Sequence, residues 1–294
     1  MSFAVMEVLK DFPDQECRII LLGKSGAGKS KSANSILSTD LFDVSSEHDS
    51  RPRIKCARSS LSVYEKSLLV VDTPGFAESQ DGRQSVVQVI KDAIVATCPG
   101  PHAVVLVTRC DVTITSAETD IVSQLRSVLG EELRRHLVLL LTHGDMEQRD
   151  VRQLLDASPA HVKELLKDIN ERYVVFNNEG SREEQERQVQ QLLRLVHQMV
   201  LESPRQVFSC PLLRECEKDI TYMRNRLRML EPRIETCRDD VRRLSQDEGV
   251  APEKLGHVLA LTAQAIEDLK ELAAVDEKLT ARVGRENLTS CSVS

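Results

Sequence analysis

The stretch that decides the fold reads Gly23-Lys24-Ser25-Gly26-Ala27-Gly28-Lys29-Ser30 and matches the pattern G-x-x-x-x-G-K-[ST]. It lies between the apolar run Ile19 to Leu22 and the helical pattern of Lys29 to Leu37, which is the context of a phosphate-binding loop. Its glycines allow a tight turn in which backbone N–H groups and the positive end of the helix point at phosphates. We expect the octet to bind a nucleotide, with Lys29 at the β and γ phosphates and the Ser30 hydroxyl on Mg²⁺. The adjacent Lys31 is added to the expected nucleotide contacts.

Continuous apolar runs recur along the first two thirds of the chain, separated by polar stretches. Four are Ile19 to Leu22, Leu68 to Val71, Ala103 to Val107 and Leu137 to Leu141, and Tyr173 to Phe176 is a fifth. Unbroken hydrophobicity is typical of parallel strands that helices cover on both faces. Helical patterns lie between the runs at Lys29 to Leu37, Arg83 to Thr97, Ser116 to Leu129 and Arg182 to Leu201. The sequence therefore predicts an α/β domain with an open, mostly parallel sheet and helices on both faces.

The tetrapeptide Asp72-Thr73-Pro74-Gly75 follows the second apolar run. Ligands of open parallel sheets bind at the carboxyl ends of the strands, so this tetrapeptide is expected to face the same crevice as the phosphate loop. We expect Asp72 to hold Mg²⁺ through a bound water and the N–H of Gly75 to reach a γ phosphate.

The tetrapeptide Thr142-His143-Gly144-Asp145 ends the fourth apolar run. It resembles the [NT]-K-x-D box of GTPases, with His143 in the place of lysine. A carboxylate accepts two hydrogen bonds from the N1–H and the exocyclic amine of guanine, whereas adenine offers neither donor in that arrangement. Asp145 therefore favours guanine, while an ATPase and, for His143, an ordinary surface turn stay open as alternatives. Asn177 and Asn178 follow the last run and are further candidates for contact with the base or its O6.

The composition of the 294 residues is that of a globular protein, with 41% hydrophobic and 29% charged residues. A formal charge of −7, the absence of Trp and only 3% aromatic residues argue against nucleic acid as a partner. The eight cysteines form no C-x-x-C pair and no cluster with histidines, as expected of free thiols in a reducing compartment. The first ten residues do not resemble a signal peptide, and no apolar run approaches the ~20 residues of a membrane helix. We expect a cytoplasmic protein.

The pattern changes after Ser203-Pro204, where apolar residues begin to recur at alternating spacings of three and four. They are Leu213, Cys216, Ile220, Met223, Leu227, Leu230, Ile234, Cys237, Val241 and Leu244. This heptad seam predicts a helix that Pro232 kinks near Met229, and a later helical pattern predicts an antiparallel hairpin. The seam packs either on the chain's own globular domain or on another chain. We expect a leader over 1–16, a nucleotide-binding domain over 17–205 and a helical extension with a frayed end over 206–294.

Taken in order, these motifs resemble those of the immunity-associated nucleotide-binding GTPases, the GIMAP family. Septin-like GTPases of the plastid outer envelope share the core of this family. The resemblance covers about Cys17 to Leu201. Its most telling part is Pro99-Gly100-Pro101-His102-Ala103, a segment that ordinary small GTPases lack between their third and fourth boxes.

The resemblance implies a domain that binds GTP or GDP with Mg²⁺, hydrolyses GTP slowly or not at all, and self-associates when GTP is bound. It also implies that the helices after the domain respond to the nucleotide. Members occupy the cytosol or intracellular membranes of immune cells, some through a C-terminal anchor, which we do not expect here. We therefore expect at most peripheral membrane contact, and a protein partner that binds the C-terminal helices.

One position departs from the family pattern. In the family, a Thr three residues before a Cys of the first switch binds Mg²⁺ in the GTP state, whereas here Arg53 stands three residues before Cys56. No Thr occurs between Thr39 and Thr73, so a replacing hydroxyl would have to come from Ser45, Ser46 or Ser50. We place Ser45 among the expected nucleotide contacts.

Two interpretations of the function follow. In the first, the chain is a GTP-dependent switch or scaffold and at most a weak GTPase; in the second, it is a pseudo-GTPase whose nucleotide is structural and whose heptad helices bind partners. Phe76 and Ala77 stand where small GTPases carry the Gln that orients water, which predicts poor intrinsic hydrolysis. An arginine from a second domain would compensate, and the candidates, each of which also fits an ordinary surface charge, are Arg51, Arg53 and Arg109.

Overall fold

This computed structural model of the chain describes residues 3–42, 54–61, 65–76, 86–111, 116–143 and 148–222, together with single residues between 225 and 274. The chain divides into two compact units; the first contains Met1–Leu213, and the second begins at Arg214. The first unit holds the sheet and all of the candidate site residues that the structure describes.

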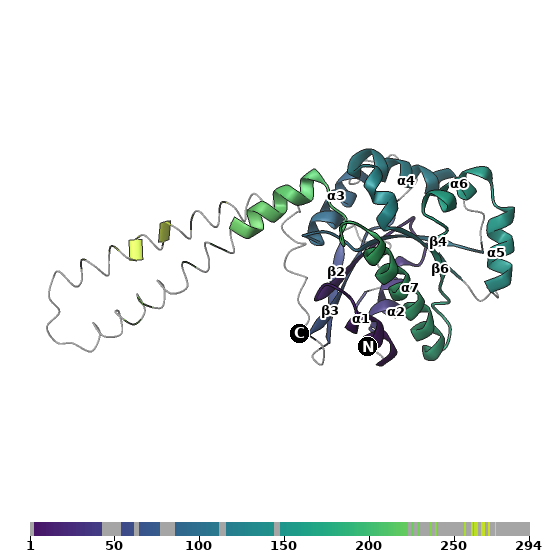
Figure 1. Cartoon of the computed structure of the whole chain (residues 1–294), viewed down its shortest axis with the longest axis horizontal. Coiled ribbons are helices and arrows are strands. Elements are labelled where there is room, and N and C mark those ends of the chain that lie inside the picture. The colour runs from purple at the N-terminus through teal and green to yellow at the C-terminus, as the bar shows by residue number, and fades with distance from the viewer. Residues whose placement is uncertain are drawn as a thin grey trace. The chain divides into compact units, whose positions relative to one another are not determined.

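The first unit is built on a twisted sheet with helices packed around it (Figure 1). The sheet has six strands in the order β2-β3-β1-β4-β5-β6. The strands are β1 (Glu16–Leu22), β2 (Lys55–Leu61), β3 (Lys66–Asp72), β4 (Ala103–Arg109), β5 (Leu137–Thr142) and β6 (Tyr173–Val175). Strands β3, β1, β4, β5 and β6 pair in parallel, and only β2 is antiparallel to its neighbour β3. The five predicted strands and the mostly parallel sheet are thus confirmed.

Strand β2 was not among the predicted strands. Its sequence, Lys55-Cys56-Ala57-Arg58-Ser59-Ser60-Leu61, contains no continuous apolar run. An edge strand pairs on one side only and needs less apolar surface than a central strand, so its pattern is weaker. Cys56 and Ala57 are nevertheless buried, which fastens this strand to the core.

Helices surround the sheet in the order α1 (Phe3–Lys10), α2 (Lys29–Leu37), α3 (Val86–Ala96), α4 (Ser116–Leu129), α5 (Gln148–Ala157), α6 (Ala160–Asp168) and α7 (Arg182–Glu202). A 3₁₀ helix, η2 (Glu131–His136), leads into β5. The predicted bounds of α2 and α4 agree with the structure, and α7 is one residue longer than predicted. Helices α1, α5 and α6 were not predicted, because each has only eight to ten residues, so that few apolar positions repeat along it.

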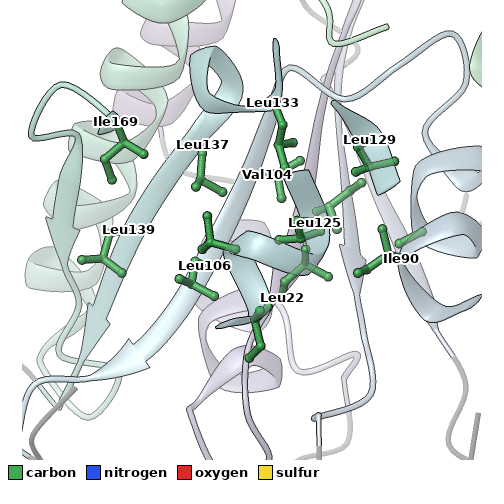
Figure 2. Packing of buried hydrophobic residues seen from close by; sticks show 14 of the residues in the cluster. Leu22, Ile90, Val104, Leu106, Leu125, Leu129, Leu133, Leu137, Leu139 and Ile169 are labelled. Atoms are coloured by element: carbon green, nitrogen blue, oxygen red, sulfur yellow. The ribbon is translucent and has the colours of Figure 1, made fainter. Parts of the chain in front are cut away.

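The sheet separates two hydrophobic clusters, which explains why its central strands are apolar throughout. In β1, Ile20 and Leu22 point into one cluster and Ile19 and Leu21 into the other. Helices α3, α4, α5 and α6 complete the first cluster, and α1, α2 and α7 complete the second (Figure 1). Figure 2 shows part of the first cluster, in which side chains from the helices and from η2 lie against those of the strands.

The first unit is wider than the expected 17–205. Helix α1 packs against α7, and the second cluster includes Val5, Leu9 and Phe12 from the stretch that was expected to be a leader. At the other end, the first cluster includes Phe208, Cys210 and Leu213, which follow α7.

The C-terminal extension begins with a helix over 211–222. Most of the heptad seam and Pro232, the residue expected to kink it, lie outside the described residues, and of the later helical segment only scattered helical residues between 256 and 274 are described. Among the helices that the structure does describe, none combines the length and the apolar character required to span a membrane.

Candidate nucleotide-binding site

The octet Gly23 to Ser30 forms the turn between β1 and α2, as predicted. Gly26 and Gly28 have φ angles of 73° and 90°, in the left-handed region that glycine adopts without a penalty. Gly28 is also the N-cap residue of α2, so the first turn of that helix opens toward the loop. An anion bound by the loop would therefore face the N-terminus of α2.

Lys29 lies within the loop rather than in solvent. Its side chain is buried, with 6% of the residue exposed, and its Nζ donates a hydrogen bond to the Lys24 carbonyl oxygen at 2.8 Å. An ammonium group in this place holds a positive charge beside the N–H groups of the loop, which suits a bound phosphate.

Ser30, at the end of the phosphate loop, contacts Asp72, at the end of β3. The Ser30 hydroxyl donates a hydrogen bond to Asp72 Oδ2 at 2.7 Å. Asp72 is only 4% exposed, and burial raises the pKa of its carboxyl group, an effect that the bond from Ser30 and the charges of Lys29 and Lys55 oppose. The other oxygen, Oδ1, is buried and has no hydrogen-bond partner among the described residues.

A buried carboxylate with one oxygen unpaired fits a hydrated Mg²⁺ ion, since such an oxygen requires a donor or a cation. The described part of the chain holds no group of three or more His, Cys, Asp or Glu side chains that would ligate a metal by themselves. Mg²⁺ would therefore need phosphate oxygens and water for its remaining ligands, as it does in nucleotide sites. Ser30 and Asp72 would hold it, and the ion would neutralise charge on the β and γ phosphates.

The loop after β3 packs directly on the phosphate loop. A Cβ atom added to Gly75 would lie 2.4 Å from the Ser25 Cα, so only glycine fits there. The Phe76 N–H donates to the Gly23 carbonyl oxygen at 3.2 Å, and the Thr73 hydroxyl donates to the Leu21 carbonyl oxygen at 2.8 Å. These contacts bring Gly75 beside the phosphate loop, which is where a γ-phosphate contact requires it.

Thr142 connects the end of β5 to the phosphate loop. Its buried hydroxyl donates to the Ala27 carbonyl oxygen at 2.8 Å and lies 3.2 Å from the Thr108 carbonyl oxygen. A Cβ atom added to Gly28 would lie 3.1 Å from the Thr142 Cγ2, so the threonine side chain leaves little room for a larger residue at that glycine. The contact was not anticipated, although a hydroxyl residue at the end of a central strand is the signal that would have suggested it.

His143 is exposed and adopts a left-handed φ of 59°. Its carbonyl oxygen accepts a hydrogen bond from the Cys110 thiol at 3.3 Å. The structure thus brings the start of the predicted base-binding box to the same edge of the sheet as the phosphate loop, whereas Asp145 lies outside the described residues.

Asn177 and Asn178 make contacts within the protein. The Asn178 amide nitrogen donates to Ser32 Oγ at 3.1 Å, and its oxygen accepts from Ser35 Oγ at 3.1 Å. Asn177 Oδ1 accepts from the Glu179 backbone N–H at 3.1 Å. The sequence suggested contact with a base, but it did not suggest these partners on α2.

Five further candidates were expected from the sequence, and the structure describes two of them. Lys31 is exposed and forms an ion pair with Glu179 of the loop after β6. Arg109, proposed as an arginine for a second domain, forms two hydrogen bonds to the Asp111 carboxylate, at 2.9 and 2.6 Å. Ser45, Arg51 and Arg53 lie outside the described residues.

The segment Pro99 to Ala103 lies at the opposite, amino end of the strands. Arg18 of β1, which is 5% exposed, donates from Nε to the Gly100 carbonyl oxygen at 2.7 Å. His102 Nδ1 accepts from the Arg18 backbone N–H at 2.9 Å, and its Nε2 lies 3.0 Å from Asp14 Oδ2. The Phe208 N–H donates to the Pro101 carbonyl oxygen at 2.9 Å. This segment therefore joins β1 to the chain that follows α7.

The sequence profile of the AIG1 family matches residues 17–227, which is well over half of the chain. The chain belongs to the AIG1 family. The resemblance noted from its motifs is thereby confirmed, and relatives of the chain bear the names of the same immune-associated GTPases.

Among these relatives, GTPase IMAP family member 8 of Rattus norvegicus is 30% identical over 212 residues, covering 70% of this chain and 30% of that protein. Its Homo sapiens counterpart is 32% identical over 187 residues, covering 63% of this chain and 28% of that protein. Immune-associated nucleotide-binding protein 7 of Arabidopsis thaliana is 29% identical over 187 residues, covering 60% of this chain and 59% of that protein. The match thus spans less than a third of the mammalian relatives and under two thirds of the plant one.

Solved structures of Toc33 from Arabidopsis thaliana share the fold. The complex with GDP and Mg²⁺ aligns with a TM-score of 0.54 at 18% identity, covering 70% of this chain and 94% of that one. The complex with Mg²⁺ and GMPPNP aligns with a TM-score of 0.53 at 20% identity, covering 69% and 92%. At this identity the likeness establishes the P-loop GTPase fold alone.

Proposed function

We propose that this AIG1-family chain binds a guanine nucleotide together with Mg²⁺ at the carboxyl ends of β1, β3 and β5. The observation that carries the proposal is the assembly of Lys29, the Ser30–Asp72 hydrogen bond and the unpaired Asp72 Oδ1 around one glycine turn. Toc33, which has this fold, has been solved with GDP and Mg²⁺, and this supports the same ligands here.

The choice of guanine depends on Asp145, in the box that Thr142 begins. Thr142 is bonded to the phosphate loop, so the ligand of that box would share a crevice with the phosphates. Asp145→Asn is expected to shift preference from guanine toward xanthine, since an amide no longer accepts both donors of guanine. Competition of GDP, XDP and ADP against a fluorescent GDP measures this, and unchanged preference in the variant would refute the base assignment.

Lys29→Ala tests the phosphate side of the proposal. The variant removes the charge from the loop, and the affinity for GDP is expected to fall at least about tenfold. Lys167→Ala is a suitable control, because Lys167 lies in α6, away from the loop. Equal affinities for GDP in the wild type and in Lys29→Ala would contradict the site.

We infer further that the nucleotide acts as a switch: GTP promotes self-association of the nucleotide domain and changes the exposure of the C-terminal helices, while hydrolysis is slow. Phe76, where other GTPases carry a water-orienting Gln, is 8% exposed and packs in the first hydrophobic cluster. A Toc33 study concludes that dimerisation is important for the GTPase activity of chloroplast translocon components, and this precedent supports self-association as a means of control.

The switch is tested on the full chain by light scattering and hydrogen exchange, with GDP and with a non-hydrolysable GTP analogue. The expected result is a larger mass and altered protection beyond Leu213 with the analogue. Equal masses and equal protection with both nucleotides would exclude the switch.

A second candidate function is a pseudo-GTPase in which the nucleotide is structural and the C-terminal helices bind a protein partner. It is favoured by one observation, the absence of any Thr between Thr39 and Thr73 to ligate Mg²⁺ beside a γ phosphate. The two functions differ in binding of the GTP analogue. The switch requires that Mg²⁺ tighten this binding, whereas the pseudo-GTPase binds GDP and shows no such dependence.

A further inference from the structure

The loop 177–181, which follows β6, is bound to the helix that starts at the phosphate loop. Asn178 makes both of its side-chain hydrogen bonds to α2, donating to Ser32 Oγ and accepting from Ser35 Oγ, each at 3.1 Å. The two serines lie three residues apart and so share one face of the helix. One side chain therefore spans the gap between the loop and a full turn of α2.

The loop is also fixed from its other side by α7. Gln185 Nε2 donates to the Asn178 carbonyl oxygen at 3.0 Å and to the Gly180 carbonyl oxygen at 3.1 Å. Gln188 Oε1 accepts from the Asn177 backbone N–H at 3.0 Å. Asn178 is thus the point at which a loop that α7 already orders is joined to α2.

The position of Ser32 relates this junction to the phosphates. Its backbone N–H donates to the carbonyl oxygen of Gly28, the last glycine of the phosphate loop, at 2.9 Å. Ser32 is fully buried, so it has little freedom to move away from the loop. The ion pair of Lys31 with Glu179 joins the same elements, but both side chains are exposed and such pairs contribute little.

We propose that Asn178 is a positioning residue that sets the distance between the phosphate loop and the base-binding edge of the site. This inference rests on the proposed guanine-nucleotide function. Loop 177–181 follows a strand adjacent to β5, so it borders the edge where Thr142 and His143 lie. A nucleotide gains affinity from both ends only if the two ends of its site are held in register before it binds.

The proposal is tested with Asn178→Ala and Ser35→Ala, which break the junction from opposite sides. GDP affinity is expected to fall about 3- to 10-fold in each variant, the loss of one or two hydrogen bonds that order the site. The GDP affinity of the double variant is expected to lie within about twofold of that of Asn178→Ala, because both changes remove the same link between the loop and α2. Gln198→Ala is the control, because among the described residues its amide bonds to Glu202 within α7 and to no residue of the loop or of α2.

Two ligands separate positioning from other roles. Pyrophosphate, used as a competitor of fluorescent GDP, reports the phosphate loop alone and is expected to bind all variants equally. 6-Thio-GDP keeps the N1–H and the exocyclic amine but carries sulfur, a weaker acceptor, in place of O6, and its affinity is expected to fall in parallel with that of GDP. Thermal denaturation checks that each variant remains folded.

Three results would overturn the proposal. Weaker pyrophosphate binding in Asn178→Ala would mean that the phosphate loop itself is disturbed. A loss confined to GDP, with an unaffected Ser35→Ala variant, would mean that Asn178 contacts O6 directly. Unchanged GDP affinity in both variants would mean that the junction has no role in binding. By contrast, a wild-type chain that fails to bind GDP would refute the proposed function instead.

Discussion

Gly75 and Ser25 are in such close contact that a Cβ atom on Gly75 would lie 2.4 Å from the Ser25 Cα and 2.5 Å from its nitrogen. Both partners are backbone atoms, so the clash cannot be relieved by rotating a side chain. We expect Gly75→Ala to push the phosphate loop and the loop after β3 apart.

The expected result for Gly75→Ala is a fall in GDP affinity of about tenfold or more, measured by calorimetry, because the site loses its preformed shape. Gly130→Ala is the matched control. Gly130 has a φ of 93° but no atom within 4 Å of an added Cβ, so the change strains the backbone without touching the site. If Gly75→Ala binds GDP as tightly as Gly130→Ala does, the close contact has no functional role.

Gly100 is the corresponding contact at the amino end of the strands. A Cβ atom there would lie 2.0 Å from the Phe208 carbonyl oxygen. Gly100→Ala is therefore expected to lower the free energy of unfolding by about 2 to 4 kcal/mol, as overpacking and loss of a buried hydrogen bond do. Urea denaturation measures the change, and a loss no larger than that of Gly130→Ala would contradict the expectation.

His102 is expected to make the protein sensitive to acid. Burial lowers the pKa of His102 to about 3, and the charge of Arg18 acts in the same direction while Asp14 opposes it. The folded state therefore holds the neutral ring, whereas the unfolded chain takes up a proton below the ordinary pKa of 6.5. Above pH 6.5 His102 therefore does not lower the free energy of unfolding. As the pH decreases from there toward 3, the free energy of unfolding falls by up to about 1.4 kcal/mol per pH unit.

This acid sensitivity is measured by urea denaturation between pH 7 and pH 4. His102→Asn, in which the amide oxygen replaces Nδ1 as the acceptor of the Arg18 N–H, is expected to be less stable at pH 7 but to show a shallower pH dependence. His197→Asn is the control, since that residue contacts Phe12 from α7 and lies outside the Arg18 network. Equal slopes in wild type and His102→Asn would exclude His102 as the cause.

Asp92 of α3 is expected to oppose folding at neutral pH. Burial raises its pKa from 3.8 to about 6, although Gln88 Nε2 donates a hydrogen bond to it at 2.6 Å. The contribution of Asp92 to the free energy of unfolding is therefore most favourable below pH 3.8, and it is lost as the pH rises through about 6. Asp92→Asn retains an acceptor for Gln88 and is expected to add about 1 to 2 kcal/mol at pH 7.5 and almost nothing near pH 4.

Thermal denaturation at the two pH values measures the effect of Asp92→Asn. Asp156→Asn on α5, where the side chain is exposed, provides the comparison. The same gain at both pH values would show that the carboxyl charge is not responsible.

The parts of the fold that were predictable are those with a strong local signal. The runs of β1 and β5 are apolar on both faces because the sheet lies between two clusters, and the glycines of the octet are required by left-handed φ angles. Strand β2 escaped prediction because it lies at the sheet edge, and α1 because its eight residues carry little periodicity.

The site was predictable at the level of motifs and less so at the level of contacts. The Ser30–Asp72 pair follows from two motifs that end neighbouring strands. The hydrogen bonds of Thr142 to Ala27 and of Asn178 to α2 depend on which side chains face each other across the sheet edge. The spacing of residues along the sequence does not reveal these neighbours. The predicted roles of Asp145 and Ser45 stay predictions.

The burial of Phe208, Cys210 and Leu213 bears on how the protein can be shortened. A chain cut at Arg205, where the polar turn after α7 suggests a boundary, would leave the first cluster uncovered beside Gly100 and remove the partner of the Pro101 carbonyl oxygen. Such a fragment would aggregate through the newly exposed surface, and its larger particles would be mistaken for an oligomer. A cut beyond Leu213 avoids this artefact and allows the heptad helices to be removed without damaging the domain they follow.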